Sequence, residues 1–130
     1  MAACTVLQRT IFCYGGYDNS ENPIGDTWSL DVSVQFSLAM TSWNNVSHNN
    51  DFITTPILRG VILPLADGVS FLVNGGQTTP RNTSEVNQTT IFNTESRIWS
   101  TLNITNITQA TERRAVVDPF GKFWFWGGYR

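Results

Sequence analysis

Residues 123–130 are FWFWGGYR, so four consecutive aromatic side chains stand directly before a pair of glycines. The same kind of junction occurs at residues 11–17, IFCYGGY, and at residues 71–77, FLVNGGQ. β-branched and aromatic residues favour strands, and paired glycines let the backbone turn or approach another segment closely. Three such junctions, about fifty to sixty residues apart, are typical of a repeat array such as a propeller or a solenoid. The simpler alternative is three unrelated strand-to-turn junctions.

The residues that follow the glycine pairs extend the repeat. A polar stretch after the second pair leads to TTIFNTESRIW, in which Phe92 precedes Trp99 by seven positions. In the first unit Leu30 and Asp31 take the equivalent places, and Trp43 follows after a longer loop. Each unit therefore predicts a four-stranded antiparallel meander. We expect the two tryptophans to be buried at equivalent sites on the fourth strands.

This pattern resembles the Kelch repeat family, whose units combine a hydrophobic run ending in Gly-Gly, a separated aromatic and acidic pair, and a tryptophan beyond it. Residues 71–99 match it well, whereas the first unit has Leu30 where the family has an aromatic residue. The third unit, residues 113–128, supplies only the first two strands. The positions that carry the motif are Gly15, Gly16, Trp43, Gly75, Gly76, Phe92, Trp99, Gly127 and Gly128.

The resemblance implies an all-β fold, a fragment of a Kelch-type β-propeller built from four-stranded antiparallel blades. Blade 1 is expected over about residues 1–48, blade 2 over about 57–105, and the first hairpin of blade 3 over about 113–128. Kelch propellers commonly have about five to seven blades, so the ring is not closed within this chain. The strands before the glycine pairs should end near Tyr14, Asn74 and Trp126.

Composition excludes several classes of partner. Hydrophobic residues make up 41% of the chain and charged residues 14%, and the net charge is −2, so there is no basic surface for nucleic acid. No apolar run reaches the roughly eighteen residues of a membrane span. A membrane anchor would therefore have to belong to a longer protein.

The two cysteines predict a disulfide. A two-residue turn at Gln8 and Arg9 would place Cys4 opposite Cys13, at a non-hydrogen-bonded pair of antiparallel strands. The α-carbons of such a pair lie about 4.5–5.5 Å apart, a distance that suits a disulfide. The alternative is two free, buried thiols.

The chain also contains five Asn-X-Ser/Thr acceptors for N-linked glycans: Asn45, Asn82, Asn87, Asn103 and Asn106. Together with the disulfide they favour a secretory, extracellular or cell-surface protein, although residues 1–10 show no signal peptide. The alternative is a cytoplasmic protein in which an Asn- and Thr-rich composition produces acceptors by chance. The strand order of the predicted blades places all five at one face. Glycans there would direct a protein partner to the opposite face or to other blades.

Residues that could support chemistry are sparse. His48 is the one histidine, no His and Cys set suits zinc or copper, and neither a phosphate loop nor a Gly-X-Ser-X-Gly elbow is present. Asp67 and Asp118 lie in the first hairpin turns, where turn chemistry explains them. We therefore expect no catalytic residue, no metal and no cofactor.

The function expected from the sequence is that of a non-catalytic interaction module, which binds a protein or glycan partner through propeller loops. The aromatic residues 123–126 are expected to pack between blades rather than to form a binding platform. Two alternatives are a structural or scaffold domain and part of a galactose oxidase-like enzyme. In the second case the active residues would lie outside this chain.

Overall fold

The structure is a computed structural model, and it describes residues 2–34, 41–47, 56–78, 88–103 and 111–129. The described residues form strands and turns and no helix. The strands are β1 (Ala3–Leu7), β2 (Thr10–Tyr14), β3 (Thr27–Asp31), β4 (Asn44–Asn45), β5 (Val61–Pro64), β6 (Ser70–Asn74), β7 (Thr89–Asn93), β8 (Ile98–Thr101), β9 (Thr111–Val117) and β10 (Phe123–Tyr129).

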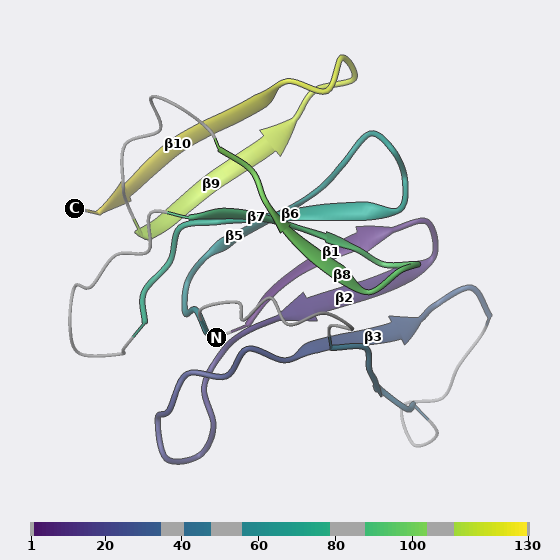
Figure 1. The fold of residues 1–130 in the computed structure, drawn as a ribbon, viewed down its shortest axis with the longest axis vertical. Helices are drawn as coiled ribbons and strands as arrows, with labels where there is room; N and C mark the ends of the chain where they lie inside the picture. Colours follow the sequence, from purple (N-terminus) through teal and green to yellow (C-terminus); the bar gives the residue numbers. More distant parts are fainter. Residues whose placement is uncertain (1, 35–40, 48–55, 79–87, 104–110, 130) are drawn as a thin grey trace.

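The strands form three units that follow each other along the chain. Sheet A has the order β1-β2-β3-β4 and sheet B the order β5-β6-β7-β8, and hairpin C joins β9 to β10. All pairs are antiparallel. In Figure 1, β5 of sheet B lies between β1 and β9, and it contacts both. The predicted all-β fold with two four-stranded sheets and a hairpin is therefore confirmed. The described units form an open array without a closed ring.

No segment within the described ranges is a helix long and apolar enough to cross a membrane.

The first hairpin has the predicted register. The turn at Gln8 and Arg9 pairs Leu7 with Thr10, and Gln8 adopts a φ of 54°. This register places Cys4 opposite Cys13, with their α-carbons 4.1 Å apart, and the two form a disulfide. The predicted pairing is confirmed.

The glycine pairs share one backbone conformation. Their φ angles are 73° and 107° at Gly15 and Gly16, 65° and 104° at Gly75 and Gly76, and 70° and 95° at Gly127 and Gly128. Residues other than glycine rarely adopt such φ angles. Strands β2 and β6 end before their pairs, at Tyr14 and Asn74, as predicted. The prediction is wrong for β10, which continues to Tyr129 because Gly127 still pairs with Arg113.

The first glycine pair also joins sheet A to sheet B. The N–H of Gly16 donates to the carbonyl oxygen of Ile57, at 3.1 Å. A Cβ at Gly15 would lie only 2.5 Å from the same oxygen, so the segment before β5 can pass this closely only over a glycine.

An aromatic cluster fills the space between the two sheets. Trp99 of sheet B is 2% exposed, and its ring lies 4.9 Å from Phe92 and 4.9 Å from Tyr14 of sheet A. Phe71 packs against Trp99 at 5.9 Å and against Phe12 of sheet A at 5.8 Å. Aromatic rings from both sheets therefore pack against each other in this core, together with the aliphatic side chains of Leu7, Ile57 and Val73.

The prediction of burial is wrong for Trp43, which precedes β4 and is 43% exposed. Trp43 lines a cavity together with Cys13 and Trp28, which pair across β2 and β3. These residues lie on the face of sheet A opposite to Phe12 and Tyr14, because side chains alternate along a strand. Sheet B covers only the Tyr14 face.

The aromatic run of β10 is divided in the same way. Phe123 and Phe125 are half-buried on one face, whereas Trp124 and Trp126 are 49% and 52% exposed on the other. The expected packing on both faces is therefore present on one face only.

Replacing Gly15 by alanine should destabilise the chain more than the same change at Gly127. Both glycines have a φ near 70°, but nothing lies within 4 Å of a Cβ at Gly127. Gly127→Ala should lower the free energy of unfolding by about 1 kcal/mol through backbone strain. Gly15→Ala should lower it by about 2–4 kcal/mol, because the clash with Ile57 adds to the strain. Chemical denaturation of both variants measures this difference. Equal losses would contradict the close approach.

Trp99→Ala should reduce the free energy of unfolding by about 3–5 kcal/mol, because it removes a buried ring from the contact between the sheets. Trp43→Ala is the matched control and should cost less than about 1 kcal/mol in dilute protein. Thermal or urea unfolding of the two variants gives the comparison. Similar values would mean that the two tryptophans have similar surroundings.

Candidate functional site

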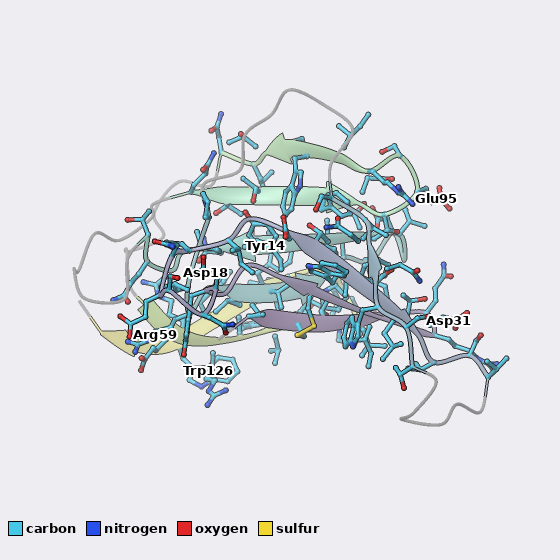
Figure 2. All side chains as sticks on the ribbon, turned by 90° about the horizontal axis from the view of Figure 1, so that it is seen from below. Tyr14, Asp18, Asp31, Arg59, Glu95 and Trp126 are labelled. Carbon is cyan, nitrogen blue, oxygen red and sulfur yellow. A yellow bond between two sulfur atoms is a disulfide. The ribbon has the colours of Figure 1, made fainter. Side chains whose placement is uncertain are left out.

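The three units share two ends, one with the glycine pairs and the other with the hairpin turns. In Figure 2, Asp18 and Arg59 lie at one side of the molecule, and Asp31 and Glu95 lie at the opposite side. We call the first the Gly-Gly end, because the three glycine pairs and the loop after β2 lie there. We call the second the hairpin end, because the turns between β1 and β2, β5 and β6, β7 and β8, and β9 and β10 lie there.

Carboxylate and amide side chains at the hairpin end hold turns. Asp67 Oδ1 accepts from the N–H groups of Val69 and Ser70, and Asn93 Oδ1 accepts from those of Glu95 and Ser96. Such contacts satisfy the backbone of tight turns. The predicted turn role of Asp67 is therefore confirmed.

Asp118 has the same role in hairpin C. Its Oδ1 accepts from the N–H groups of Lys122 and Phe120, each at 2.9 Å, and its Oδ2 accepts from Trp124 Nε1 at 3.1 Å. The hydrogen bond from the Lys122 backbone, followed by that from Trp124, lowers the pKa of Asp118 below its ordinary value. Asp118 is therefore a structural, ionised carboxylate and not a proton donor.

Two glycan acceptors are described, and both lie toward the Gly-Gly end. Asn45 is exposed on β4 and pairs with Trp28, near the start of β3. Asn103 is exposed just beyond β8, where the N–H of Leu102 donates to the carbonyl oxygen of Thr89 at the start of β7. Asn82, Asn87 and Asn106 lie outside the described residues, as does His48.

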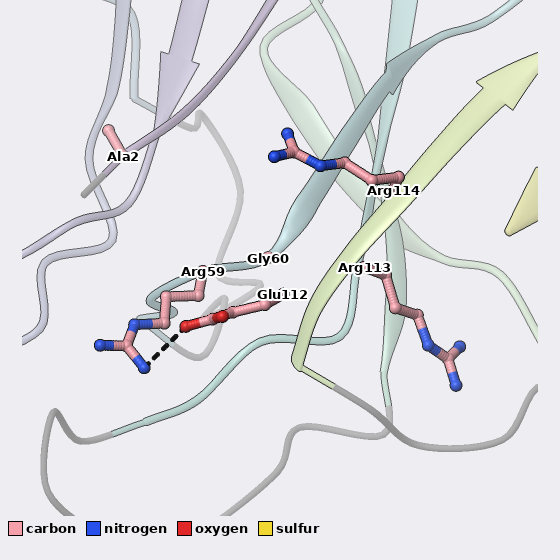
Figure 3. Close-up of a pocket in the computed structure, with 6 residues that line it drawn as sticks. All are labelled: Ala2, Arg59, Gly60, Glu112, Arg113 and Arg114. Carbon is pink, nitrogen blue, oxygen red and sulfur yellow. Dashed lines mark ion pairs between the residues drawn. The ribbon is translucent and has the colours of Figure 1, made fainter. Parts of the chain in front are cut away.

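Three arginines line a cavity at the Gly-Gly end, where β5 and β9 begin. The cavity has a volume of about 340 Å³. Its lining consists of Ala2, Arg59, Gly60, Glu112, Arg113 and Arg114, shown in Figure 3. The three units therefore all contribute to it: sheet A through Ala2, sheet B through Arg59 and Gly60, and hairpin C through the rest.

One ion pair crosses the cavity between sheet B and hairpin C. Arg59 Nη1 lies 2.9 Å from Glu112 Oε1, and the N–H of Glu112 donates to the carbonyl oxygen of Arg59 at 3.4 Å. Both residues have φ angles close to 57°, in the left-handed region. Because the two side chains are more than 40% exposed, the pair contributes little to stability and holds the arginine in place.

The cavity is positively charged although the chain as a whole carries −2. Its lining holds three arginines and one glutamate, which leaves a local charge of +2 (3 − 1). Figure 3 shows Arg59 and Arg114 extending toward the side where Ala2 lies, whereas Arg113 extends away from them. Guanidinium groups bind carboxylates and other anions through paired hydrogen bonds. The cavity can therefore hold an anionic group.

Sequence reasoning did not single out these arginines. Arg59 lies two residues before β5, whereas Arg113 and Arg114 are the third and fourth residues of β9, so they do not occupy equivalent positions of the repeat. An alignment of the repeats would therefore not have brought them together. The proximity of the three side chains depends on the packing of β5 beside β9.

Within the ranges that the structure describes, no three His, Cys, Asp or Glu residues come together in a way that could hold a metal ion. The described residues of the arginine cavity offer charged hydrogen-bonding groups.

Comparison with models of known protein families and with curated proteins gives no match to this chain.

Proposed function

We propose that this chain is part of a Kelch-type β-propeller that serves as a non-catalytic interaction module, and that its arginine cavity holds an acidic peptide segment of the partner. The propeller is supported by the repeated glycine conformation and by the two four-stranded meanders. It is also supported by the side-by-side position of the first strands β1, β5 and β9, since the inner strands of adjacent blades neighbour each other around a propeller axis.

The observation that carries the binding proposal is the cavity lined by Arg59, Arg113 and Arg114, in which Arg59 and Arg114 extend toward the same side and Arg113 extends away. A small cavity with a few polar groups is the usual form of a binding site. In an acidic protein, a local excess of positive charge selects anionic ligands and attracts them from a distance.

Two features favour the carboxylates of a peptide over an acidic glycan. Arginine is the residue type that recurs among the described residues of the lining, and no aromatic residue is among these; carboxylates match guanidinium groups directly, whereas sugar rings are usually held by stacking on aromatic rings. The Arg59–Glu112 pair also demonstrates that a carboxylate on a short side chain reaches an arginine in this cavity.

The size of the cavity and the glycan acceptors limit the partner's shape. About 340 Å³ accommodates a few side chains and not the surface of a folded protein. Asn45 lies on β4 and Asn103 just beyond β8, the strands of each sheet farthest from β1 and β5. Glycans there would obstruct a broad protein contact at this end and leave room for a slender segment.

Binding of a fluorescent polyglutamate peptide, measured by anisotropy, tests the site. Arg114→Ala should weaken binding about fivefold or more, because it removes a charged hydrogen-bonding group from the cavity. Arg97→Ala is the matched control: it changes the net charge of −2 by the same one unit, but Arg97 lies in the β7–β8 turn at the hairpin end.

Arg97→Ala should leave the affinity unchanged, and polyglutamine of the same length should not bind. Equal weakening by both variants would mean diffuse charge attraction and would contradict the site. If a uronic acid oligosaccharide bound and polyglutamate did not, the ligand of the cavity would be an acidic glycan and not an acidic peptide.

The secretory location is part of the same proposal and is supported by the Cys4–Cys13 disulfide. Protein isolated from its native host should carry N-linked glycans at Asn45 and Asn103, both of which are exposed. Glycopeptide mass spectrometry detects them. Unmodified asparagine at all five acceptors would contradict both the location and the shielding of the Gly-Gly end.

A further inference from the structure

Two faces rich in aromatic side chains have no covering unit among the described residues. On hairpin C, Val116, Trp124 and Trp126 are 48%, 49% and 52% exposed, and we call this surface the Trp126 face. Trp126 pairs with Arg114, and Lys122 Nζ lies 4.6 Å from the centre of the Trp124 ring, so the rim of this face is charged. Figure 2 shows Trp126 projecting away from the strands.

The second face lies on sheet A, opposite to Phe12 and Tyr14. It carries Ile11, Cys13, Trp28, Leu30 and Trp43, and we call it the Trp43 face. Trp43 is 43% exposed on it, whereas Leu30 is buried.

The Trp126 face repeats the surface with which sheet A covers sheet B. Trp126 stands directly before Gly127 as Tyr14 stands before Gly15, and the two glycines have φ angles of 70° and 73°. Trp124 lies two positions earlier, where β2 has Phe12. In the existing interface, Tyr14 and Phe12 are the side chains that contact Trp99 and Phe71. The Trp126 face thus has larger aromatic rings at both contact positions.

The Trp43 face repeats the opposite half of that interface, the surface of sheet B that receives Tyr14. Ile11 pairs with Leu30 as Phe71 pairs with Phe92. Trp43 precedes Asn44, which pairs with Ser29, and this places Trp43 beside Leu30 as Trp99 lies beside Phe92.

A cavity beside Trp43 marks the place where the missing aromatic ring would fit. Its volume is about 340 Å³, and its lining includes Gly15, Gly16, Trp28 and Trp43. In sheet B the equivalent glycines are Gly75 and Gly76, and the equivalent tryptophan, Trp99, is covered by the ring of Tyr14 at 4.9 Å.

We infer that the Trp126 face of one chain packs on the Trp43 face of a second copy of the same chain. Each chain carries both halves of an interface that it already forms between its own sheets A and B, so a second copy supplies the complement of each face. The contact joins two different surfaces and is therefore heterologous, and it closes only if the rotation per unit completes a turn.

The number of units allows closure with two chains. The described residues of each chain supply two four-stranded sheets and one two-stranded hairpin, so two copies supply four sheets (2 × 2) and two hairpins (2 × 1). Closed propellers contain about four to eight four-stranded blades, and the four sheets alone reach the lower end of that range. Two reciprocal contacts then form a two-fold symmetric ring, in which both faces of each chain are covered.

Sedimentation velocity of the purified 130-residue chain tests the inference. We expect a dimer of twice the 14.5 kDa chain mass at micromolar concentration. Trp126→Arg and Trp43→Arg should each give monomers. Phe120→Arg is the matched control and should stay dimeric, because Phe120 is 95% exposed in the β9–β10 turn and belongs to neither face. Near-ultraviolet circular dichroism checks that the exposed-residue variants remain folded.

Mixing the two arginine variants distinguishes the heterologous contact from a self-complementary one. The Trp126→Arg chain keeps an intact Trp43 face and the Trp43→Arg chain an intact Trp126 face, so the mixture should form a one-contact heterodimer. Both cysteines are already paired within the chain, so disulfide exchange does not produce a dimer.

Three results would overturn the inference. A wild-type monomer would mean that other polypeptide covers the two faces, open-ended polymers would mean that the contact does not close, and a dimer that survives Trp126→Arg would place the contact elsewhere. Arg114 pairs with Trp126 on hairpin C, so a docked copy would also lie beside the arginine cavity. Sedimentation is measured without added ligand, so its outcome is distinguishable from a failure of polyglutamate to bind.

Discussion

The structure depends on the close approach of the Gly15-Gly16 backbone to the carbonyl oxygen of Ile57. Ile57 stands shortly before β5, the first strand of sheet B, and its carbonyl oxygen accepts a hydrogen bond from the N–H of Gly16 in sheet A. A side chain at Gly15 would prevent this, because its Cβ would lie 2.5 Å from that oxygen. With the glycine pair in place, the two sheets come near enough for Tyr14 to contact Trp99. The aromatic core between the sheets follows from this backbone contact.

The same spacing between units creates the candidate site. Because β5 lies beside both β1 and β9, the residues that precede or begin these strands meet at one end of the array. Arg59 belongs to one unit and Arg113 and Arg114 to another, and the Arg59–Glu112 ion pair links them. The charge of the cavity is therefore a product of how the repeats are stacked, and it differs in sign from the charge of the whole chain. The hairpin end, in contrast, is occupied by turns whose acidic side chains are bonded to backbone N–H groups.

Equivalent aromatic positions of the repeats differ in how far they are exposed. The interior interface buries Tyr14 and Trp99, while the equivalent positions Trp126 and Trp43 remain half-exposed at the two ends. Tryptophans exposed in this way are unusual on a monomer surface and are common at the centres of interfaces. The exposure of each aromatic position therefore depends on whether another described unit packs on its face, and the arginine cavity forms where β5 lies beside β9.

The sequence by itself determined the local features of this protein. The turn at Gln8 and Arg9 fixed the pairing of Cys4 with Cys13, the glycine pairs fixed the backbone after β2 and β6, and Asp67 and Asp118 fixed their turns, because each depends on residues only a few positions apart. The tertiary structure alone decided that Trp99 is buried while Trp43 is exposed, and that three arginines share a cavity. Burial of a side chain and clustering of charges depend on which unit packs on a given face. The sequence of one repeat does not show whether another unit packs on it.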